Sequence, residues 1–158
     1  MGGPSIYTCT PCRRRSDKGP EDYHKPERIK KEKRIETKSL YERLGGYDAI
    51  AAITDDLLAW LLNDPQFVVF WKGHSENSLR RDRQLVVNFM CEAAGGPVFY
   101  TGRDMQTSHK GLGINASDWE VFMRHAAAAL EKFAVPSPER DEVLAFLTSL
   151  QGDIVERV

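Results

Sequence analysis

From Ser39 onward, apolar residues recur every three or four positions, and this spacing constrains the fold more than any other feature of the sequence. Such spacing puts apolar side chains on one face of an α-helix, whereas a half-buried strand would place them at every second residue. We find no convincing run of alternating residues and no internal repeat. The sequence therefore predicts an all-α domain over residues 39–158.

Four main helices are expected in this domain, each with one apolar face turned to a common core. Their apolar positions are Ile50, Ile53, Leu57 and Leu61; Val86, Phe89, Met90 and Ala93; Trp119, Phe122, Met123, Leu130 and Phe133; and Val143, Leu147, Leu150 and Ile154.

Cap and turn residues predict where these helices begin and end. A short first helix should stop at Gly45-Gly46, and the helix that carries Ile50 should end near Asn63. Asp64-Pro65 supplies an N-cap and a first-turn proline for a segment up to Trp71, and Gly95-Gly96-Pro97 should stop the helix that carries Val86. A capping box at Ser117–Glu120 should open the next helix, and the last helix should start at Ser137-Pro138 and run through Ile154.

The first 38 residues differ from the rest in charge and composition. They hold 11 Lys/Arg against 6 Asp/Glu, a net charge of +5, whereas residues 39–158 hold 11 against 17, a net charge of −6. Prolines punctuate the segment, and it has too few apolar residues to offset the entropy of ordering. We expect residues 1–38 to form a basic, disordered tail, and no nucleic-acid partner is expected because aromatic residues do not interleave its charges.

Cysteine and motif content exclude several classes of protein. Cys9 and Cys12 form a lone CxxC pair without the second pair that a zinc site needs, and Arg13 replaces the histidine of the covalent haem-attachment motif. Walker loops, HExxH and GxSxG are missing. No stretch approaches the roughly 20 apolar residues of a membrane-spanning helix, and the start lacks the apolar run of a secretory signal. A cytoplasmic protein without membrane insertion is expected.

His109 is the residue with the most distinctive setting. Gly102 precedes it, Gly111 and Gly113 follow it, and they leave room for only a turn or two of helix. Met105 lies four residues earlier, on the same helical face, where it can pack against an apolar ligand. An imidazole on so short a helix can approach a flat cofactor from one side and leave the opposite face open. A lone histidine taken by itself is nevertheless more often structural than a ligand.

Four motifs together resemble the truncated haemoglobins of group I. They are Ser39-Leu-Tyr-Glu-Arg-Leu-Gly-Gly46, Gly95-Gly-Pro97, Tyr100-Thr-Gly-Arg-Asp-Met105 with His109, and Gly113-Ile114. The resemblance extends from about Ser39 to Val158. It implies a two-over-two helical sandwich around a b-type haem, with a short proximal segment.

The resemblance also implies roles for individual residues. His109 aligns with the proximal iron ligand, and Phe70 and Trp71 align with an aromatic pair that wedges against the porphyrin. Phe122 aligns with a pocket-wall residue. Two further residues align with haem-packing positions, Met105 and Ile114.

The distal side departs from the family pattern. Leu58 stands where family members carry a tyrosine, and Val86 stands where they carry a glutamine; with Phe89 these side chains predict an apolar distal pocket. Because a hydrogen-bond donor stabilises bound dioxygen, we expect faster oxygen loss and relatively better discrimination in favour of carbon monoxide. His74, in the preceding connector, is a candidate sixth iron ligand, and the register of Asp82 is left open.

These observations favour a haem protein that binds oxygen, carbon monoxide or nitric oxide at a five-coordinate or labile six-coordinate iron, as an oxygen carrier (oxygen transport) or a gas sensor. The enzymatic alternative is a nitric oxide dioxygenase, or related detoxification of nitric oxide or peroxide, which would need a separate reductase. A haem-free helical scaffold is the third alternative, because apolar stripes usually form only a core. Arg80, Arg81 and Arg83 form either an exposed basic edge or, through one of them, a contact to a haem propionate.

Overall fold

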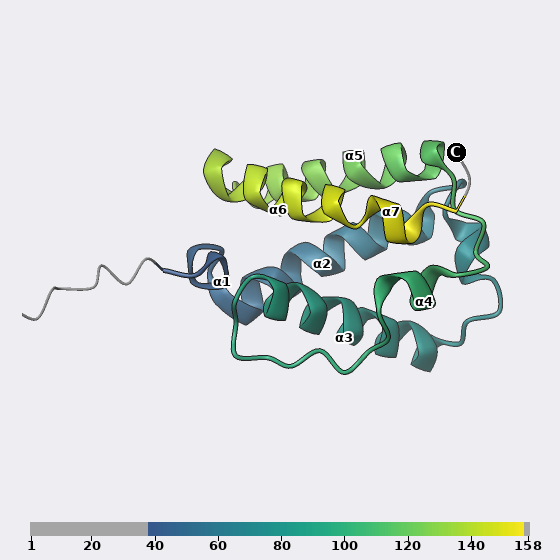
Figure 1. The fold of residues 1–158 in the computed structure, drawn as a ribbon, viewed down its shortest axis with the longest axis horizontal. Helices are drawn as coiled ribbons and strands as arrows, with labels where there is room; N and C mark the ends of the chain where they lie inside the picture. The colour runs from purple at the N-terminus through teal and green to yellow at the C-terminus, as the bar shows by residue number, and fades with distance from the viewer. Residues whose placement is uncertain (1–37, 157–158) are drawn as a thin grey trace, which may run out of the picture. The chain divides into compact units, whose positions relative to one another are not determined.

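The computed structural model describes residues 38–156, and every regular element in this range is helical (Figure 1). In chain order these elements are α1 (Leu40–Arg43), α2 (Gly46–Asn63), the 3-10 helix η1 (Val68–Trp71), α3 (Glu76–Ala93), α4 (Met105–His109), α5 (Ala116–Lys132), α6 (Ser137–Ser149) and α7 (Gln151–Ile154). Cys9, Cys12, His24 and nearly all of the predicted tail lie outside the described residues.

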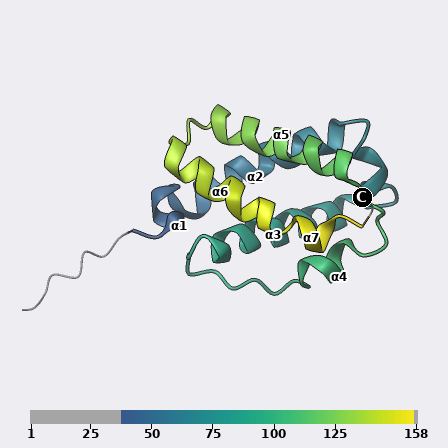
Figure 2. The same cartoon turned by 45° about the horizontal axis from the view of Figure 1, so that its top comes forward.

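Four long helices form two packed pairs. Helix α2 packs against both α3 and α5, and α5 packs against α6, so that α5 and α6 lie side by side over α2 and α3 (Figures 1 and 2). One core cluster joins α2 to α3 through residues that include Ile50 and Val87, and a second joins α5 to α6 through Leu130 and Val143. The predicted sandwich of helix pairs is confirmed.

Glycines allow the short helix α1 to dock at the end of α3. The Tyr41 N–H donates to the Ala94 carbonyl at 2.8 Å, and a Cβ atom at Gly96 would come within 2.5 Å of the Tyr41 ring. Gly95 adopts a φ of +81°, which favours glycine. The predicted stop at Gly95-Gly96 is therefore correct. The two glycines end α3, and Gly96 also lets the Tyr41 ring of α1 approach the backbone closely.

Two predicted starts are wrong because side-chain oxygens cap the backbone elsewhere. Helix α5 is capped by Asn115, whose Oδ1 accepts the Ser117 and Asp118 N–H groups at 2.8 and 3.1 Å, so Ser117 already lies in the first turn. Asp64 ends α2, as expected near Asn63, but its Oδ1 accepts the Gln66 N–H at 2.8 Å in a turn that leads into η1. Competition of this kind between side chains and backbone is usual for Asn and Asp.

The predicted last helix is divided into α6 and α7. Near the break, the Thr148 hydroxyl donates to the Leu144 carbonyl at 2.8 Å and the Ser149 hydroxyl donates to the Phe146 carbonyl at 2.6 Å. Such back-bonding competes with the helical ladder and bends helices. As a result α7 packs against α4, at the end of the domain where His109 lies.

Within residues 38–156, no helix is both long enough and apolar enough to cross a membrane.

Candidate functional site

A cavity of about 850 Å³ lies between the helix pairs, and residues of α4 line part of it. Its volume is within the range of about 300–1,000 Å³ that is usual for small-molecule and cofactor sites. All ten residues predicted for the site line it: Leu58, Phe70, Trp71, His74, Val86, Phe89, Met105, His109, Ile114 and Phe122. The structure thus brings together residues from α2, η1, α3, α4 and α5.

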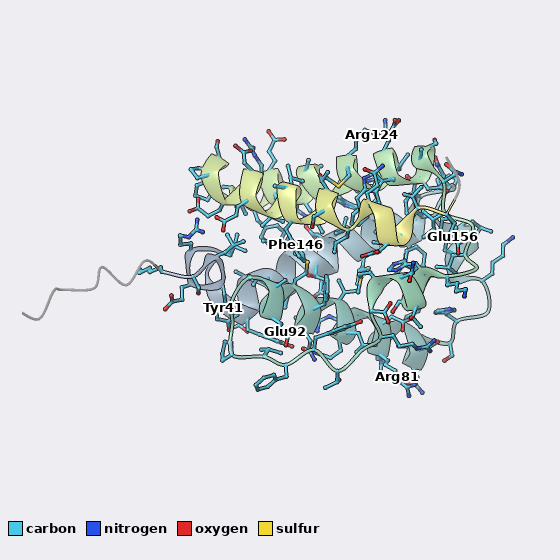
Figure 3. The ribbon with its side chains drawn as sticks, viewed as in Figure 1. Tyr41, Arg81, Glu92, Arg124, Phe146 and Glu156 are labelled. Carbon is cyan, nitrogen blue, oxygen red and sulfur yellow. The ribbon has the colours of Figure 1, made fainter. Side chains whose placement is uncertain are left out.

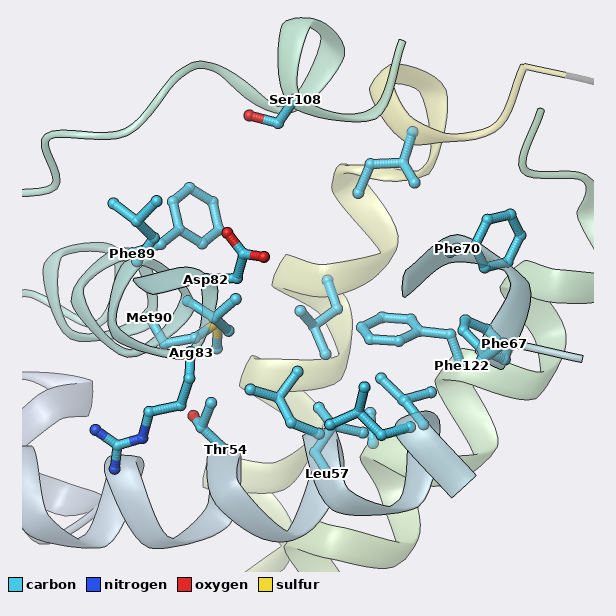
Figure 4. Close-up of a pocket in the computed structure, with 18 of the residues that line it drawn as sticks. Thr54, Leu57, Phe67, Phe70, Asp82, Arg83, Phe89, Met90, Ser108 and Phe122 are labelled. Carbon is cyan, nitrogen blue, oxygen red and sulfur yellow. The ribbon is translucent and has the colours of Figure 1, made fainter. Parts of the chain in front are cut away.

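Aromatic side chains form one wall of the cavity. Figure 4 shows Phe67, Phe70 and Phe122 grouped on the side of η1 and α5. The Phe67 and Phe70 rings meet edge to face with centroids 5.7 Å apart, and Trp119 lies 5.3 Å from Phe122. Aromatic pairs favour offset and edge-to-face arrangements. The wall is therefore an apolar, aromatic surface that suits a flat, apolar ligand.

A short, well-capped helix carries the predicted iron ligand. The Asp104 carboxylate caps α4 by accepting the Thr107 N–H and the Thr107 hydroxyl, both at 2.8 Å, and the Thr107 N–H holds the pKa of Asp104 below its ordinary value. Just before the helix, the Tyr100 hydroxyl donates to the Arg103 carbonyl at 2.7 Å. A Cβ atom at Gly102 would lie 2.2 Å from that hydroxyl oxygen, so a larger residue there would displace the Tyr100 ring.

The imidazole of His109 is half-buried, lines the cavity and has a defined tautomer. Its Nδ1 atom lies 2.8 Å from the Met105 carbonyl oxygen. A carbonyl can only accept, so the proton is on Nδ1 and the neutral ring keeps a lone pair on Nε2. Metal-binding histidines commonly make this contact, which fixes the ring and raises its basicity. The arrangement leaves Nε2 as the atom that can bind a metal.

The opposite side of the cavity is largely aliphatic but not entirely so. Leu58 and Val86 both line it, as predicted from the sequence. Polar residues of α2 and α3 also line it, among them two that the sequence did not identify as site residues: Thr54, which is 4% exposed, and Asp82. Figure 4 shows the Asp82 carboxylate turned toward the cavity. Thr54 could have been found from its position one helical turn before Leu58.

His74 lies at the edge of the cavity and is paired with Asp82. Its Nδ1 atom is 3.1 Å from the Asp82 carboxylate, and its side chain is 39% exposed. A role as sixth ligand would require the imidazole to leave this contact and move inward, so it stays a prediction.

The arginines at the start of α3 have separate partners. Arg80 pairs with Glu76 one turn earlier, and Arg83 crosses to α2, where its Nε and a terminal nitrogen donate to both oxygens of Asp55 at 2.6 and 2.9 Å. This fork-to-carboxylate contact ties α3 to α2. Arg80 and Arg103 both line the cavity, and of these two Arg80 already pairs with Glu76.

We expect Asp55→Asn to lower the free energy of unfolding by about 0.2–1 kcal/mol at neutral pH, because the pair is half-exposed. The Arg83 guanidinium holds the pKa of Asp55 below its unfolded value of 3.8. Because its native pKa is the lower one, ionised Asp55 stabilises the fold above the unfolded pKa of 3.8. This contribution is lost as the pH falls through the native pKa. Urea unfolding of both proteins across this range measures the difference; a difference that grows on acidification, or that persists at high salt, contradicts the assignment.

The sequence matches the bacterial-like globin family over residues 39–156. The group 1 truncated hemoglobin GlbN of Mycolicibacterium paratuberculosis is 32% identical over 122 residues, which cover 77% of this chain and 88% of that protein. The chain belongs to the group 1 truncated haemoglobins.

Solved structures of truncated haemoglobins have the same fold. The Fe(III) form of truncated hemoglobin from Tetrahymena pyriformis superposes with a TM-score of 0.68 at 23% identity, over 75% of this chain and 98% of that one. The 2/2 hemoglobin of Synechococcus sp. PCC 7002, solved in the cyanomet state with covalently attached heme, gives 0.68 at 25% identity, over 76% and 100%. The predicted two-over-two globin fold is confirmed.

Truncated haemoglobins are haem globins, so a haem cofactor is expected here. The residues of the cavity fit this group. The aromatic wall can cover a porphyrin face, His109 offers an unprotonated Nε2, and Arg103 and Arg80 can pair with propionates.

Proposed function

We propose that this globin holds haem b through Nε2 of His109 and reversibly binds a diatomic gas (oxygen, carbon monoxide or nitric oxide) as a carrier or sensor. The observation that carries the proposal is the His109 ring, which lines an apolar cavity with its Nδ1 proton held by the Met105 carbonyl at 2.8 Å. Bound haem would supply an iron that can take up a diatomic gas while Nε2 of His109 holds it.

The residues that line the cavity have separate roles in this proposal. Phe70, Trp71 and Phe122 would cover the cofactor from the η1 and α5 side, and Met105 and Ile114 line the same cavity as His109. Leu58 and Val86 exclude water from the gas side without offering a hydrogen bond. These two side chains would therefore give bound oxygen no polar stabilisation.

His74 is the chain's candidate for a labile sixth ligand within this proposal. We expect the ferric protein to show a low-spin component that His74→Ala removes. A high-spin spectrum that is identical in the two proteins would leave the iron five-coordinate in protein ligands and would exclude this role.

Haem titration of the purified protein tests the function directly. We expect uptake of one haem per chain, followed by Soret bands that shift on reduction with dithionite and again on addition of carbon monoxide. Flash photolysis of the carbon monoxide form should give rebinding from solution. If no Soret band develops with haem in excess, the haem-free helical scaffold becomes the working hypothesis.

A further inference from the structure

The C-terminal segment holds the loop that follows His109. The Gly111 N–H donates to Oε1 of Glu156 at 2.5 Å, and the Gly113 N–H donates to Oε2 of the same carboxylate at 2.6 Å. The Glu156 N–H in turn donates to the Ile114 carbonyl at 2.9 Å. Figure 3 shows Glu156 at the end of the domain to which the chain returns after α7. Glu156 thus makes three hydrogen bonds to three positions of the loop, Gly111, Gly113 and Ile114.

The loop is shaped to receive a carboxylate. Gly111 and Gly113 adopt φ values of +86° and +69°, which favour glycine and turn both N–H groups toward one point. Converging backbone N–H groups of this kind form anion-binding nests. Hydrogen bonds to a charged acceptor are stronger than neutral ones, so the contact is a firm attachment of the loop.

This loop is continuous with the helix that carries the iron ligand. The Leu112 N–H donates to the His109 carbonyl at 3.2 Å, which ties the loop to the histidine backbone. Helix α4 has only five residues, and isolated helices of that length are not stable in water. Asp104 fixes the first turn of the helix, and Glu156 fixes the backbone just past its last residue.

We propose that Glu156 is a positioning residue for His109. Its carboxylate holds the Gly111–Gly113 backbone and thereby sets the position of the imidazole against the haem, while Met105 sets the rotation of the ring. Glu156 is not among the residues that line the cavity, so it acts through the loop and not by contact with the cofactor. The inference rests on the proposed function, because it concerns the same iron ligand.

Three variants of the haem-loaded protein test this role. Glu156→Ala removes both contacts; Glu156→Gln keeps the shape but turns an NH₂ group, a donor, toward one loop N–H. Asp153→Asn is the matched control, since it makes the same charge change in the same segment. Among the hydrogen bonds of residues 38–156, none joins the Asp153 side chain to this loop.

Three measurements test the successive steps by which Glu156 would act on the haem. Amide exchange at Gly111 and Gly113 reports the contacts, the iron–histidine stretching band of the ferrous protein reports the imidazole, and haem transfer to apomyoglobin reports retention. For Glu156→Ala we expect faster exchange at both glycines, a shifted or broadened band and roughly tenfold faster transfer. Glu156→Gln should lie between wild type and Glu156→Ala, and Asp153→Asn should match wild type.

The outcomes separate this inference from the proposed function. If wild type binds haem through His109 and the Glu156 variants keep its band and transfer rate, the positioning role is wrong and the proposed function stands. If wild type takes up no haem, both fail. If Glu156→Ala does not fold, Glu156→Gln decides: faster glycine exchange in that variant with an unchanged band and transfer rate overturns the role.

Discussion

His109→Gly is expected to release most of the haem from the protein and to change the spectrum of what remains. Nε2 of His109 is the atom we assign to the iron, and the glycine variant removes it together with the ring that fills this side of the cavity. The loss of haem affinity should exceed the roughly 10–100-fold that is typical when only an outer-shell partner of a ligand is removed. Haem titration followed at the Soret band measures it.

Added imidazole makes this experiment specific. Glycine leaves a space where the side chain was, and free imidazole can enter it and bind the iron, so haem affinity and the wild-type spectrum should return with increasing imidazole. Rescue of this kind separates loss of a ligand from loss of the fold.

His125→Ala is the matched control for the histidine change. His125 lies on α5, its Nε2 is 2.8 Å from an Asp64 oxygen, and it is not among the residues that line the cavity. We expect an unchanged haem spectrum in this variant. Equal loss of haem in the two variants would mean that His109 has no special role.

The fold could be predicted from the sequence because apolar spacing reports which face of each helix is buried. Leu130 and Val143 were assigned to core faces from this spacing, and both are buried between α5 and α6. Helix ends were harder to predict, because they depend on which of several neighbouring polar side chains accepts the hydrogen bond from a free backbone N–H. Asn115 captures two such groups ahead of Ser117, and nothing in the local pattern ranks one above the other.

The candidate site could be predicted only as far as motifs and alignment extend. The segment around His109 is local in sequence, so its glycines and Met105 indicate a short helix directly. Glu156 is 45 residues from Gly111 and bonds to backbone groups, which no side-chain pattern reports. Asp82 could not be assigned to the site for a different reason. The length of the connector before α3 left the alignment of Asp82 open, and the structure places this residue at the cavity.

Leu58→Tyr is expected to slow oxygen release by roughly 10- to 150-fold. The leucine lines the side of the cavity opposite His109, where a phenol hydroxyl could donate to bound oxygen. A hydrogen bond to a partially charged acceptor contributes about 1.5–3 kcal/mol, and each 1.36 kcal/mol corresponds to a factor of ten in rate. Carbon monoxide carries less charge when bound, so its release should change much less. Stopped-flow displacement of oxygen by carbon monoxide gives the oxygen release rate, and displacement of carbon monoxide by nitric oxide gives the carbon monoxide release rate.

Leu58→Phe isolates the hydroxyl from the added volume. A phenylalanine ring fills the same space as tyrosine but has no donor, so any slowing caused by crowding alone should occur equally in both variants. We therefore expect Leu58→Phe to release oxygen nearly as fast as wild type.

Equal slowing in the two variants would show that access controls release. A wild-type protein that already releases oxygen as slowly as Leu58→Tyr would mean that another donor reaches the gas, and Thr54, buried one turn before Leu58, would be the first to replace with valine.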